Sequence, residues 1–214
     1  MSFEYFSKLT KTPTIDTIPG CQSHEEFVRP YRNLLKTSRN TYISSAVMIL
    51  LYNLEGKAMI PCIKRSKRPG DKHSGQIGLP GGRKDVSDKD LWHTALRECQ
   101  EEVGLNHSPQ YITKLSPVEI PVSGYEIHPY IALSQEMIPW KIDSTEVESL
   151  HFIEVKDLLR APIQEHPVEV EYLSHRINVP AFLIDDMVIW GATAMILAEF
   201  RDWIVLQEKT IGAA

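Results

Sequence analysis

Two neighbouring runs of apolar residues in the first third of the chain predict a pair of strands joined by a tight turn. Residues 42–52 are apolar and partly β-branched, and residues 57–63 continue in the same style. The short segment Asn53-Leu54-Glu55-Gly56 separates them and ends in glycine. Apolar runs of strand length bounded by turn residues are typical of a β-hairpin. We therefore expect strand, turn and strand at 42–63.

Similar patterns continue to the end of the chain. They predict strands at 110–119 and 125–133, a strand running into a short helix at 146–160, a hairpin of 179–184 and 187–189 around Asp185-Asp186, and a closing helix at 190–206. The closing helix has apolar faces that suit burial against a sheet. Strands interleaved with long helices predict an α/β (α+β) fold, a sandwich with a mixed central sheet.

The pattern also divides the chain. Residues 1–40 contain scattered prolines and are expected to be an irregular or helical lead-in packed on the core, with a short helix possible at 27–35. Residues 41–207 are expected to form the domain, and residues 208–214 a tail. A chain of 214 residues with 43% hydrophobic content can bury one good core.

A further helix is predicted in the middle of the chain, ending before Gly104. A buried stripe at helical spacing is formed by Ala95, Leu96, Cys99 and Val103. Candidate N-cap residues are Ser87, Asp88 and Asp90. Gly104 stands where a helix needs a left-handed residue after its last turn.

Three carboxylates lie on one face of this helix. Glu98, Glu101 and Glu102 are spaced i, i+3 and i+4, so their side chains point the same way. Like charges at this spacing repel, and a bound divalent cation is the best reason to keep them. Hard oxygen ligands without Cys or paired His suit Mg²⁺ or Mn²⁺ rather than zinc. The alternative is an amphipathic helix whose acidic face is solvated.

The segment from Gly82 to Leu105 resembles the Nudix box, usually written G-x5-E-x7-R-E-U-x-E-E-x-G-U with U aliphatic. The core Arg97-Glu98 … Glu101-Glu102 … Gly104 is intact. Two departures lie upstream, where Asp88 replaces the box glutamate and eight residues, rather than seven, separate it from Arg97. The extra residue leaves the metal-binding glutamates in register.

A second signature precedes the box and resembles the motif of coenzyme A pyrophosphatases. It comprises Arg65-Ser66 and the stretch His73-Ser74-Gly75-Gln76-Ile77-Gly78-Leu79-Pro80-Gly81-Gly82. It departs from that motif at Ile63, at Leu79 and at Asp71, which stands where a second Arg is expected. Either Arg68 or Lys72 could replace that Arg. The subfamily tolerates the longer box spacing and the Asp, and downstream stretches at 123–130, 146–147 and 189–197 extend the similarity to roughly residues 42–202.

The resemblance implies a Nudix-type α/β/α sandwich and hydrolysis of a pyrophosphate with Mg²⁺ or Mn²⁺. It assigns metal coordination to Glu98, Glu101 and Glu102, with Arg97 orienting them by ion pairing. Glu98 could alternatively act as general base, and Glu146 is a weaker candidate for base or outer metal contact, against a solvated strand-edge carboxylate. Gly81 and Gly82 would let the backbone approach metal and phosphates.

The implied substrate is coenzyme A or a derivative, giving phosphopantetheine and adenosine bisphosphate. Two alternatives stay open: another nucleoside diphosphate-X such as ADP-ribose or a dinucleotide, and a non-catalytic nucleotide-sensing module. Residues 64–73 carry five Lys or Arg against one Asp. They form either an exposed charged loop or a basic collar for substrate phosphates, with contacts expected from Arg65, Arg68, Lys72 and His73. Ser123, Tyr125 and His128 are expected to border the pocket.

The composition of the chain excludes some classes of binding partner. The net charge of −5 argues against a nucleic-acid binder, which would want a basic face. Three cysteines without disulfide or metal spacing point to a reducing compartment, and no apolar run reaches the roughly 20 residues of a membrane span. We expect a cytoplasmic enzyme that acts on a small nucleotide substrate, with a homodimer possible by analogy with the family.

Overall fold

The strand β1 (Ile43–Leu54) runs through the centre of the protein. It is seen in a computed structural model that describes residues 1–10, 17–28, 41–67, 73–170 and 175–211. Met48 and Leu50 point into one core cluster, whereas Ile49 and Leu51 point into a second cluster on the opposite face. Successive side chains of a strand point to opposite faces, so this one apolar strand supplies both halves of the core.

The predicted hairpin joins β1 to β2 (Lys57–Arg65). Its turn residues Glu55 and Gly56 both have positive φ, 52° and 83°. Two consecutive residues with positive φ match the twist of the flanking strands, which is why a glycine in this turn is favoured. The side chain of Asn53 adds an acceptor for the Gly56 N–H at 2.8 Å.

The rest of the large sheet is mixed, as expected. β7 (Tyr125–Ser134) runs parallel to β1 over ten paired residues, whereas its other partners, β5 (Gln110–Lys114) and β6 (Val118–Ile120), are antiparallel to it. β8 (Val147–Glu154) pairs antiparallel with the outer edge of β2. The parallel pair needs a crossover, and the central helix of the chain lies in that connection.

Two short strands fill the space where β1 and β2 separate. Only the turn end of β1 pairs with β2. Farther from the turn, β3 (Ile77–Gly78) pairs with the inner edge of β2, and β4 (Gly81–Arg83) pairs with β1. The N–H of Met48 donates to the carbonyl of Pro80 between them, at 2.9 Å. The glycine-rich segment is therefore built into the middle of the sheet.

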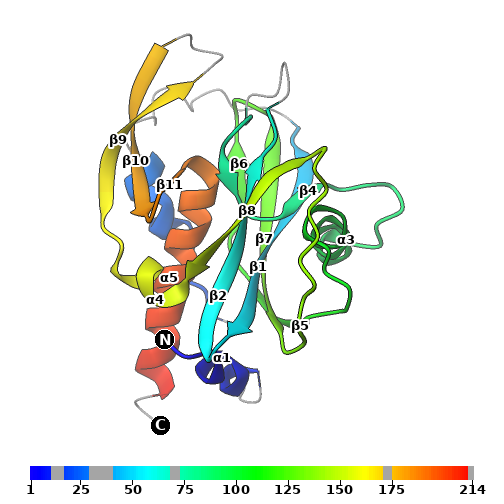
Figure 1. Cartoon of the computed structure of the whole chain (residues 1–214). Coiled ribbons are helices and arrows are strands. Elements are labelled where there is room, and N and C mark those ends of the chain that lie inside the picture. Colours follow the sequence, from blue (N-terminus) through cyan, green and yellow to red (C-terminus); the bar gives the residue numbers. More distant parts are fainter. Residues whose placement is uncertain (11–16, 29–40, 68–72, 171–174, 212–214) are drawn as a thin grey trace.

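Helices cover both faces of the large sheet (Figure 1). The helix α3 (Leu91–Val103) packs on one face, and α5 (Gly191–Ile211) lies on the other. A second sheet stands beside α5, formed by β9 (Ile163–Val170), β10 (His175–Ile184) and β11 (Met187–Trp190). The short helix α4 (Val155–Arg160) continues directly from β8. This is the α/β sandwich with a mixed sheet that the sequence predicts.

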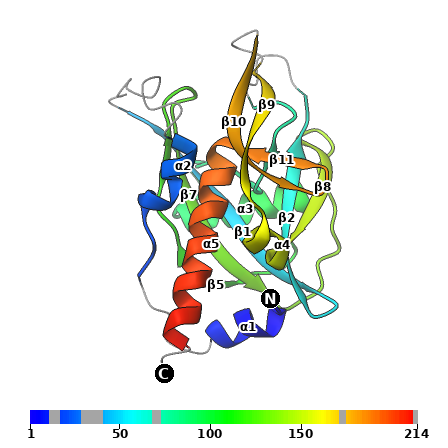
Figure 2. The same cartoon turned by 90° about the vertical axis from the view of Figure 1, so that its left-hand side faces the viewer.

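The N-terminal segments pack along α5. These are α1 (Phe3–Leu9), a 3₁₀ turn η1 (Cys21–His24) and α2 (Glu25–Val28), and Figure 2 shows α1 and α2 near opposite ends of α5. Phe6 is fully buried and stacks on Phe200 at 6.4 Å between ring centroids. The division into lead-in, domain and tail remains a prediction, and these contacts agree with a lead-in that packs on the core.

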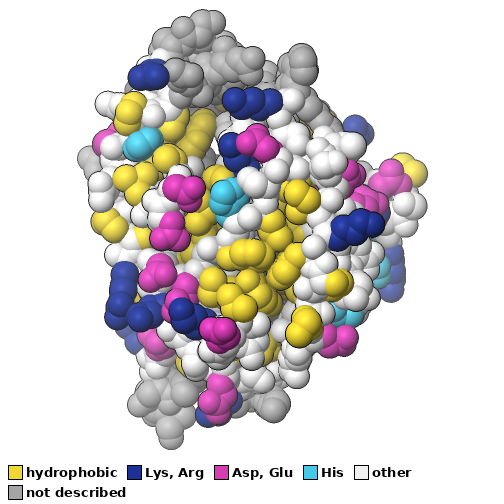
Figure 3. Space-filling view, in the orientation of Figure 1, with side chains coloured by type: hydrophobic (Ala, Val, Ile, Leu, Met, Phe, Trp, Pro, Cys, Tyr) yellow, Lys and Arg dark blue, Asp and Glu magenta, His cyan; other side chains and the backbone are white. Residues whose placement is uncertain are grey.

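Hydrophobic side chains gather in the middle of the face shown in Figure 3. Among the partly buried residues that cover the core beside α3 are Trp140 and Phe152, whose rings lie 5.3 Å apart. Both also pack against the buried ring of Tyr52. Aromatic edge-to-face packing of this kind adds to the burial energy. Among the described helices, none has the length and apolar character to cross a membrane.

Several elements differ from the sequence expectation. The predicted strand at 110–119 is two strands, β5 and β6, because the chain breaks at Ser116-Pro117. The sequence pattern did not reveal α1 or β9, and Pro167 inside β9 weakens its strand signal. The closing helix continues five residues beyond its predicted end at Leu206. Most of the short helix proposed at 27–35 falls outside the described residues.

A buried carboxylate fastens the lead-in to α5. Glu199 has no exposed surface, and it accepts hydrogen bonds from the Gly20 N–H at 3.1 Å and from His24 Nε2 at 3.0 Å. The hydroxyl of Ser116 donates to it at 2.7 Å, and so does its N–H at 3.2 Å. A buried charge is tolerated where donors surround it, so this group holds three distant segments together.

We expect Glu199→Ala to lower the free energy of unfolding by about 3 to 5 kcal/mol, because it leaves several buried donors without an acceptor. The matched control is Asp202→Ala, which removes an exposed carboxylate one turn later on α5 and should cost less than about 0.5 kcal/mol. Urea unfolding followed by circular dichroism measures both. Equal effects of the two substitutions would contradict the assigned role.

The same group gives this stability a pH dependence. Burial alone would raise the pKa of Glu199, but hydrogen bonds from His24 and Ser116 outweigh it and lower the pKa below the ordinary 4.5. A carboxyl with a lowered folded-state pKa stabilises the fold above its unfolded pKa, and this contribution is lost as the pH falls through the folded value. The stability difference between wild type and Glu199→Gln should therefore shrink on acidification from neutral pH.

Candidate active site

The helix α3 is fixed at both ends by the residues that bound it. Of the three candidate N-caps, Asp90 takes the position and accepts from the His93 N–H at 2.9 Å. At the other end Gly104 adopts φ 77°, as the sequence predicts for a left-handed cap. The stripe of Ala95, Cys99 and Val103 is buried against the sheet. This orientation turns the acidic residues toward the end of the sheet that holds β4.

Three carboxylates meet there: Glu98 and Glu102 from α3, and Glu146 from the loop just before β8. Each offers an oxygen, and these oxygens all lie within 4.8 Å of one another. Glu102 is buried, with 1% of its surface exposed, and the other two are half-buried. Carboxylate oxygens at this density are the donor set that hard divalent cations prefer. We call Glu98, Glu102 and Glu146 the carboxylate triad.

Burial makes the carboxylates of Glu98 and Glu102 costly to ionise. It raises the pKa of Glu102 to about 8, with a further contribution from Glu98, although the Gly81 N–H donates to Glu102 Oε2 at 2.8 Å. Burial also raises the pKa of Glu98, against the opposing effect of Arg97. Crowded, desolvated carboxylates of this kind are typical of functional sites, where a cation relieves their repulsion.

The two glycines of β4 lie directly against the triad. A Cβ on Gly82 would come within 2.5 Å of the Glu98 carboxylate. Gly81 has φ 155°, and a Cβ there would collide with the carbonyl of Ala46 and with Val47. The glycines thus allow β4 to pass between β1 and the carboxylates. The approach of the backbone to metal and phosphates stays a prediction, whereas Gly81 and Gly82 contact the carboxylates of Glu102 and Glu98 themselves.

Arg97 connects the acidic residues around it. Its Nε and Nη2 donate to the two oxygens of Asp88, each at 3.0 Å, in a bidentate pair. Nη1 donates to Glu98 and to Glu101, each at 2.9 Å, and Nη2 also reaches the carbonyl of Arg83 at 3.1 Å. The pair with Arg97 holds the pKa of Asp88 well below its usual range. Such forked contacts fix orientation as well as charge.

The departure of the box at Asp88 is therefore accommodated by the loop. Asp88 is nearly buried, and its carboxylate also accepts from the Asp85 N–H at 2.9 Å. Asp85 in turn accepts from the N–H and hydroxyl of Ser87. One extra residue between Asp88 and Arg97 is absorbed in this compact turn. Asp has a shorter side chain than the Glu of the usual box, and the longer connection to Arg97 allows it to reach the guanidinium.

Glu101 lies at the edge of the site. Its side chain is 57% exposed, its Oε2 contacts Arg97, and it is outside the carboxylate triad. Its predicted role as a metal ligand remains a prediction. Glu146 takes the third place in the triad instead. The sequence offers Glu146 only as a weaker candidate, from the acidic-aliphatic pair Glu146-Val147, beside the alternative of a solvated carboxylate at a strand edge.

Backbone hydrogen bonds carry the Glu146 loop to the end of α3. The N–H of Lys141 donates to Val103 O at 3.1 Å, and the N–H of Asp143 donates to Glu102 O at 3.2 Å. The Ser66 N–H at the end of β2 donates to the carbonyl of Glu146 at 2.9 Å. A Cβ on Gly104 would lie 2.9 Å from the Lys141 nitrogen, so the cap glycine also makes room for this loop.

The expected substrate residues are only partly brought to the triad. Arg65 ends β2 on the side of α3, and its charge acts to lower the pKa of Glu102. His73 Nδ1 lies 3.2 Å from Gln76 Oε1, in the turn that leads into β3. The side chain of His128 pairs with Glu126 at 2.8 Å, while Ser123 and Tyr125 lie at the turn before β7 and at its start. Arg68 and Lys72 fall outside the described residues.

A family model described as the NUDIX domain matches residues 43–173, which includes β4, α3 and all three members of the triad. The chain belongs to the Nudix family. The human mitochondrial coenzyme A diphosphatase NUDT8 is 30% identical over 185 residues, which cover 84% of this chain and 78% of that protein. An uncharacterized Nudix hydrolase of Yersinia pestis, NudL, is 34% identical over 129 residues. That match covers 59% of this chain and less than two thirds of NudL, 63%.

Solved structures agree on the fold. A Caenorhabditis elegans Ap4A hydrolase in a binary complex matches with a TM-score of 0.50 and 14% identity, covering 76% of this chain and 98% of that one. A MutT/nudix family protein from Enterococcus faecalis matches with a TM-score of 0.50 and 19% identity, covering 86% and 73%. Family membership makes this chain a Nudix pyrophosphatase that acts on small nucleotide substrates, and enzymes of this family generally use divalent metals.

The contact between Gly82 and Glu98 can be tested by adding one methyl group. Gly82→Ala should displace the flexible carboxylate of Glu98 while leaving the fold intact, and should lower kcat by about tenfold to a hundredfold. Gly78→Ala is the matched control, because its Cβ would meet nothing closer than 3.9 Å. Melting temperatures and steady-state kinetics of both variants are compared with wild type. Equal activity of the two variants would refute the assigned contact.

Proposed function

We propose that this Nudix enzyme hydrolyses the pyrophosphate bond of coenzyme A or its derivatives, giving phosphopantetheine and adenosine bisphosphate. The observation that carries the proposal is the likeness to human coenzyme A diphosphatase, which extends over 84% of the chain. The motif at 65–82 supports it, because its described residues include the end of β2, all of β3 and the start of β4, beside the carboxylate triad. Its last two residues, Gly81 and Gly82, touch the carboxylates directly.

We further propose that Mg²⁺ or Mn²⁺ binds to the triad, with Glu101 as a fourth carboxylate at its edge. The fit rests on the donor chemistry: the triad offers three carboxylate oxygens within 4.8 Å and has no thiol or imidazole. A cation would also offset the effects of burial and of the charge of Glu98, which raise the pKa of Glu102. When bound, the cation would act as a Lewis acid on the phosphate oxygens.

The protein residues then share the remaining tasks. Arg97 positions Glu98 by a 2.9 Å contact and is itself held by Asp88. Glu98 or Glu146 is the proposed base that takes a proton from the attacking water. Arg65 is the proposed phosphate contact nearest the triad, and we keep His73, Arg68 and Lys72 as proposed contacts of the substrate.

Two further proposals concern the setting of the enzyme. Its three cysteines, of which Cys62 and Cys99 are buried, are all free thiols, and this supports a reducing compartment such as the cytoplasm. A homodimer stays a prediction by family analogy. With a net charge of −5, we propose neither a nucleic acid nor a membrane as partner.

The metal site is tested by replacing carboxylates with isosteric amides. Glu98→Gln, Glu102→Gln and Glu146→Gln should each weaken Mn²⁺ binding by about tenfold or more, because each removes a charged ligand. Glu165→Gln, an exposed change on β9, serves as control. Binding is measured by electron paramagnetic resonance of free Mn²⁺. Unchanged Mn²⁺ binding in Glu146→Gln would show that Glu146 is not a ligand. A loss of Mn²⁺ binding in Glu101→Gln would show that Glu101 is one.

The substrate is tested by product analysis with Mg²⁺ and a panel of coenzyme A, acetyl-coenzyme A, ADP-ribose, NADH and diadenosine polyphosphates. We expect phosphopantetheine from coenzyme A in the wild type and none in Glu98→Gln, because the variant loses a carboxylate of the site. Turnover of ADP-ribose alone would keep the Nudix chemistry and reject coenzyme A. No turnover of any compound would favour a nucleotide-sensing module.

A further inference from the structure

A pocket of about 320 Å³ lies between β3 and β11. Its walls come from residues 74–77, residues 186–188 and Trp190, with Lys64 and His151 beside them. Lys64 continues the alternation of Ile60 and Cys62, which point into the core on the side of α5. The pocket therefore opens on the face of the sheet opposite α3 and its carboxylates.

Although it lies on the other face, the pocket borders the proposed active site. Lys64 and Arg65 are consecutive on β2, and the first lines the pocket while the second acts on Glu102. Glu148, whose side chain pairs with Lys64, is two residues from Glu146 of the triad. A substrate whose phosphates lie at the triad can therefore place a flexible arm around the end of β2 and into the pocket.

The charges of the pocket favour an uncharged ligand. The ammonium of Lys64 is already balanced by Glu148 at 2.6 Å, and Asp186 places a carboxylate in the wall. The side chain of Lys67 lies beside Gly75 and also acts on Glu148, so two ammonium groups balance two carboxylates and leave no net attraction for an added phosphate. The remaining wall includes the apolar side chains of Ile77 and Val188 and the ring of Trp190. Polar groups make up the larger part of the lining, which suits a ligand that carries several hydrogen-bonding groups.

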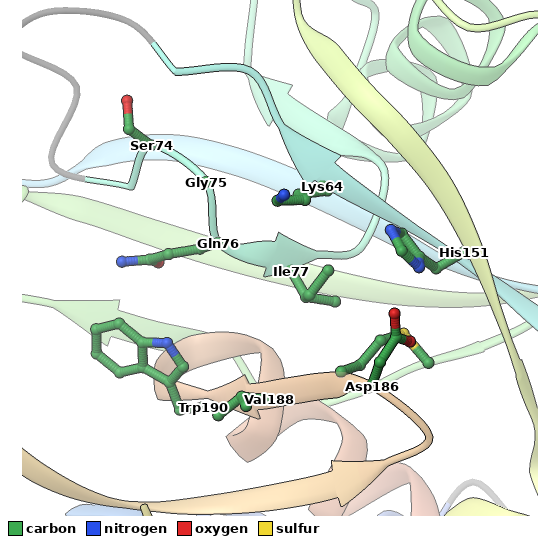
Figure 4. A pocket seen from close by; sticks show the side chains of 10 residues that line it. Lys64, Ser74, Gly75, Gln76, Ile77, His151, Asp186, Val188 and Trp190 are labelled. Atoms are coloured by element: carbon green, nitrogen blue, oxygen red, sulfur yellow. The ribbon is translucent and has the colours of Figure 1, made fainter. Parts of the chain in front are cut away.

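The lining residues of the pocket come largely from two facing segments. In Figure 4 the segment Ser74 to Ile77 forms one row, and Asp186, Val188 and Trp190 form a facing row. Trp190 and Gln76 stand at one end, and His151 and Asp186 at the other. A trough between two extended segments suits an extended chain with amide groups, because polar groups from both rows can pair with its N–H and C=O groups.

We propose that this pocket binds the pantetheine arm of coenzyme A, which is uncharged, extended and carries two amides. The inference rests on the proposed function and assigns the two halves of the substrate to different places. The pyrophosphate lies at the triad, and the adenosine bisphosphate half stays outside the pocket. Trp190 and Asp186 then determine specificity for the arm.

The test compares inhibition of coenzyme A hydrolysis by the two halves of the substrate, pantetheine and adenosine 3′,5′-bisphosphate. Trp190→Ala should raise the inhibition constant of pantetheine by about tenfold, because it removes the aromatic end of the trough. The constant for adenosine 3′,5′-bisphosphate should change less than about twofold. Tyr111→Ala, a half-exposed aromatic residue on β5, is the matched control. Circular dichroism checks that each variant is folded.

A second variant, Asp186→Ala, protects the test against misfolding, because Asp186 is exposed in the hairpin turn and its loss leaves the core intact. This variant should also raise the inhibition constant of pantetheine and leave that of adenosine 3′,5′-bisphosphate unchanged. If the inhibition constant of adenosine 3′,5′-bisphosphate rises instead, the adenosine half occupies the pocket and the inference is overturned. No change for either compound in both variants would also overturn it.

Failure of the proposed function gives a different result. If wild-type protein does not hydrolyse coenzyme A, pantetheine binding is measured directly by titration calorimetry. Binding that is lost in Trp190→Ala would then support the pocket without the hydrolase assignment. Absence of pantetheine binding to the wild type would reject the pocket inference as well.

Discussion

The site depends on holding mutually repelling carboxylates together at one end of α3. Glu98 and Glu102 are crowded and partly or fully buried, and burial raises the pKa of both. The fold offsets this cost with donors that it supplies from several directions: the Gly81 N–H on Glu102, and Arg97 on Glu98. Asp88 fixes Arg97 from the other side. These donors hold the carboxylates in position although burial raises their pKa, and a divalent cation bound there would favour their ionised form.

This constraint explains why the glycine-rich segment lies inside the sheet rather than in a surface loop. β4 must pass close enough to α3 for Gly81 to donate to Glu102, and only a residue without Cβ fits against Glu98 or Ala46. The separation of β1 from β2 makes the space for it. A segment with a turn-like sequence therefore forms the two short strands β3 and β4. Its glycines are needed because neighbouring atoms leave no room for a Cβ, as well as for their backbone conformation.

Local sequence signals predicted much of this arrangement. The spacing of Glu98, Glu101 and Glu102, the cap at Gly104 and the β1–β2 hairpin are visible because each depends on residues within a few positions. Glu146 could not be ranked in this way, since its place depends on backbone bonds from Lys141 and Asp143 to the end of α3. For the same reason the local sequence pattern did not predict α1 or β9, whose positions follow from tertiary packing. Spacing on one helix face also cannot tell that Glu101 would turn toward Arg97.

The end of β2 links the two proposed parts of substrate binding. Strand alternation sends Lys64 to one face and Arg65 to the other, so a single residue step separates the pocket from the triad. On the neighbouring strand β8, Glu148 pairs with Lys64, and Glu146 in the loop just before β8 belongs to the triad. A bulge between Lys64 and Arg65 shifts the register at this point. Bulges re-aim side chains next to functional sites, and here Glu148 is the extra residue, because Lys64 pairs with Ser149 and Arg65 pairs with Val147.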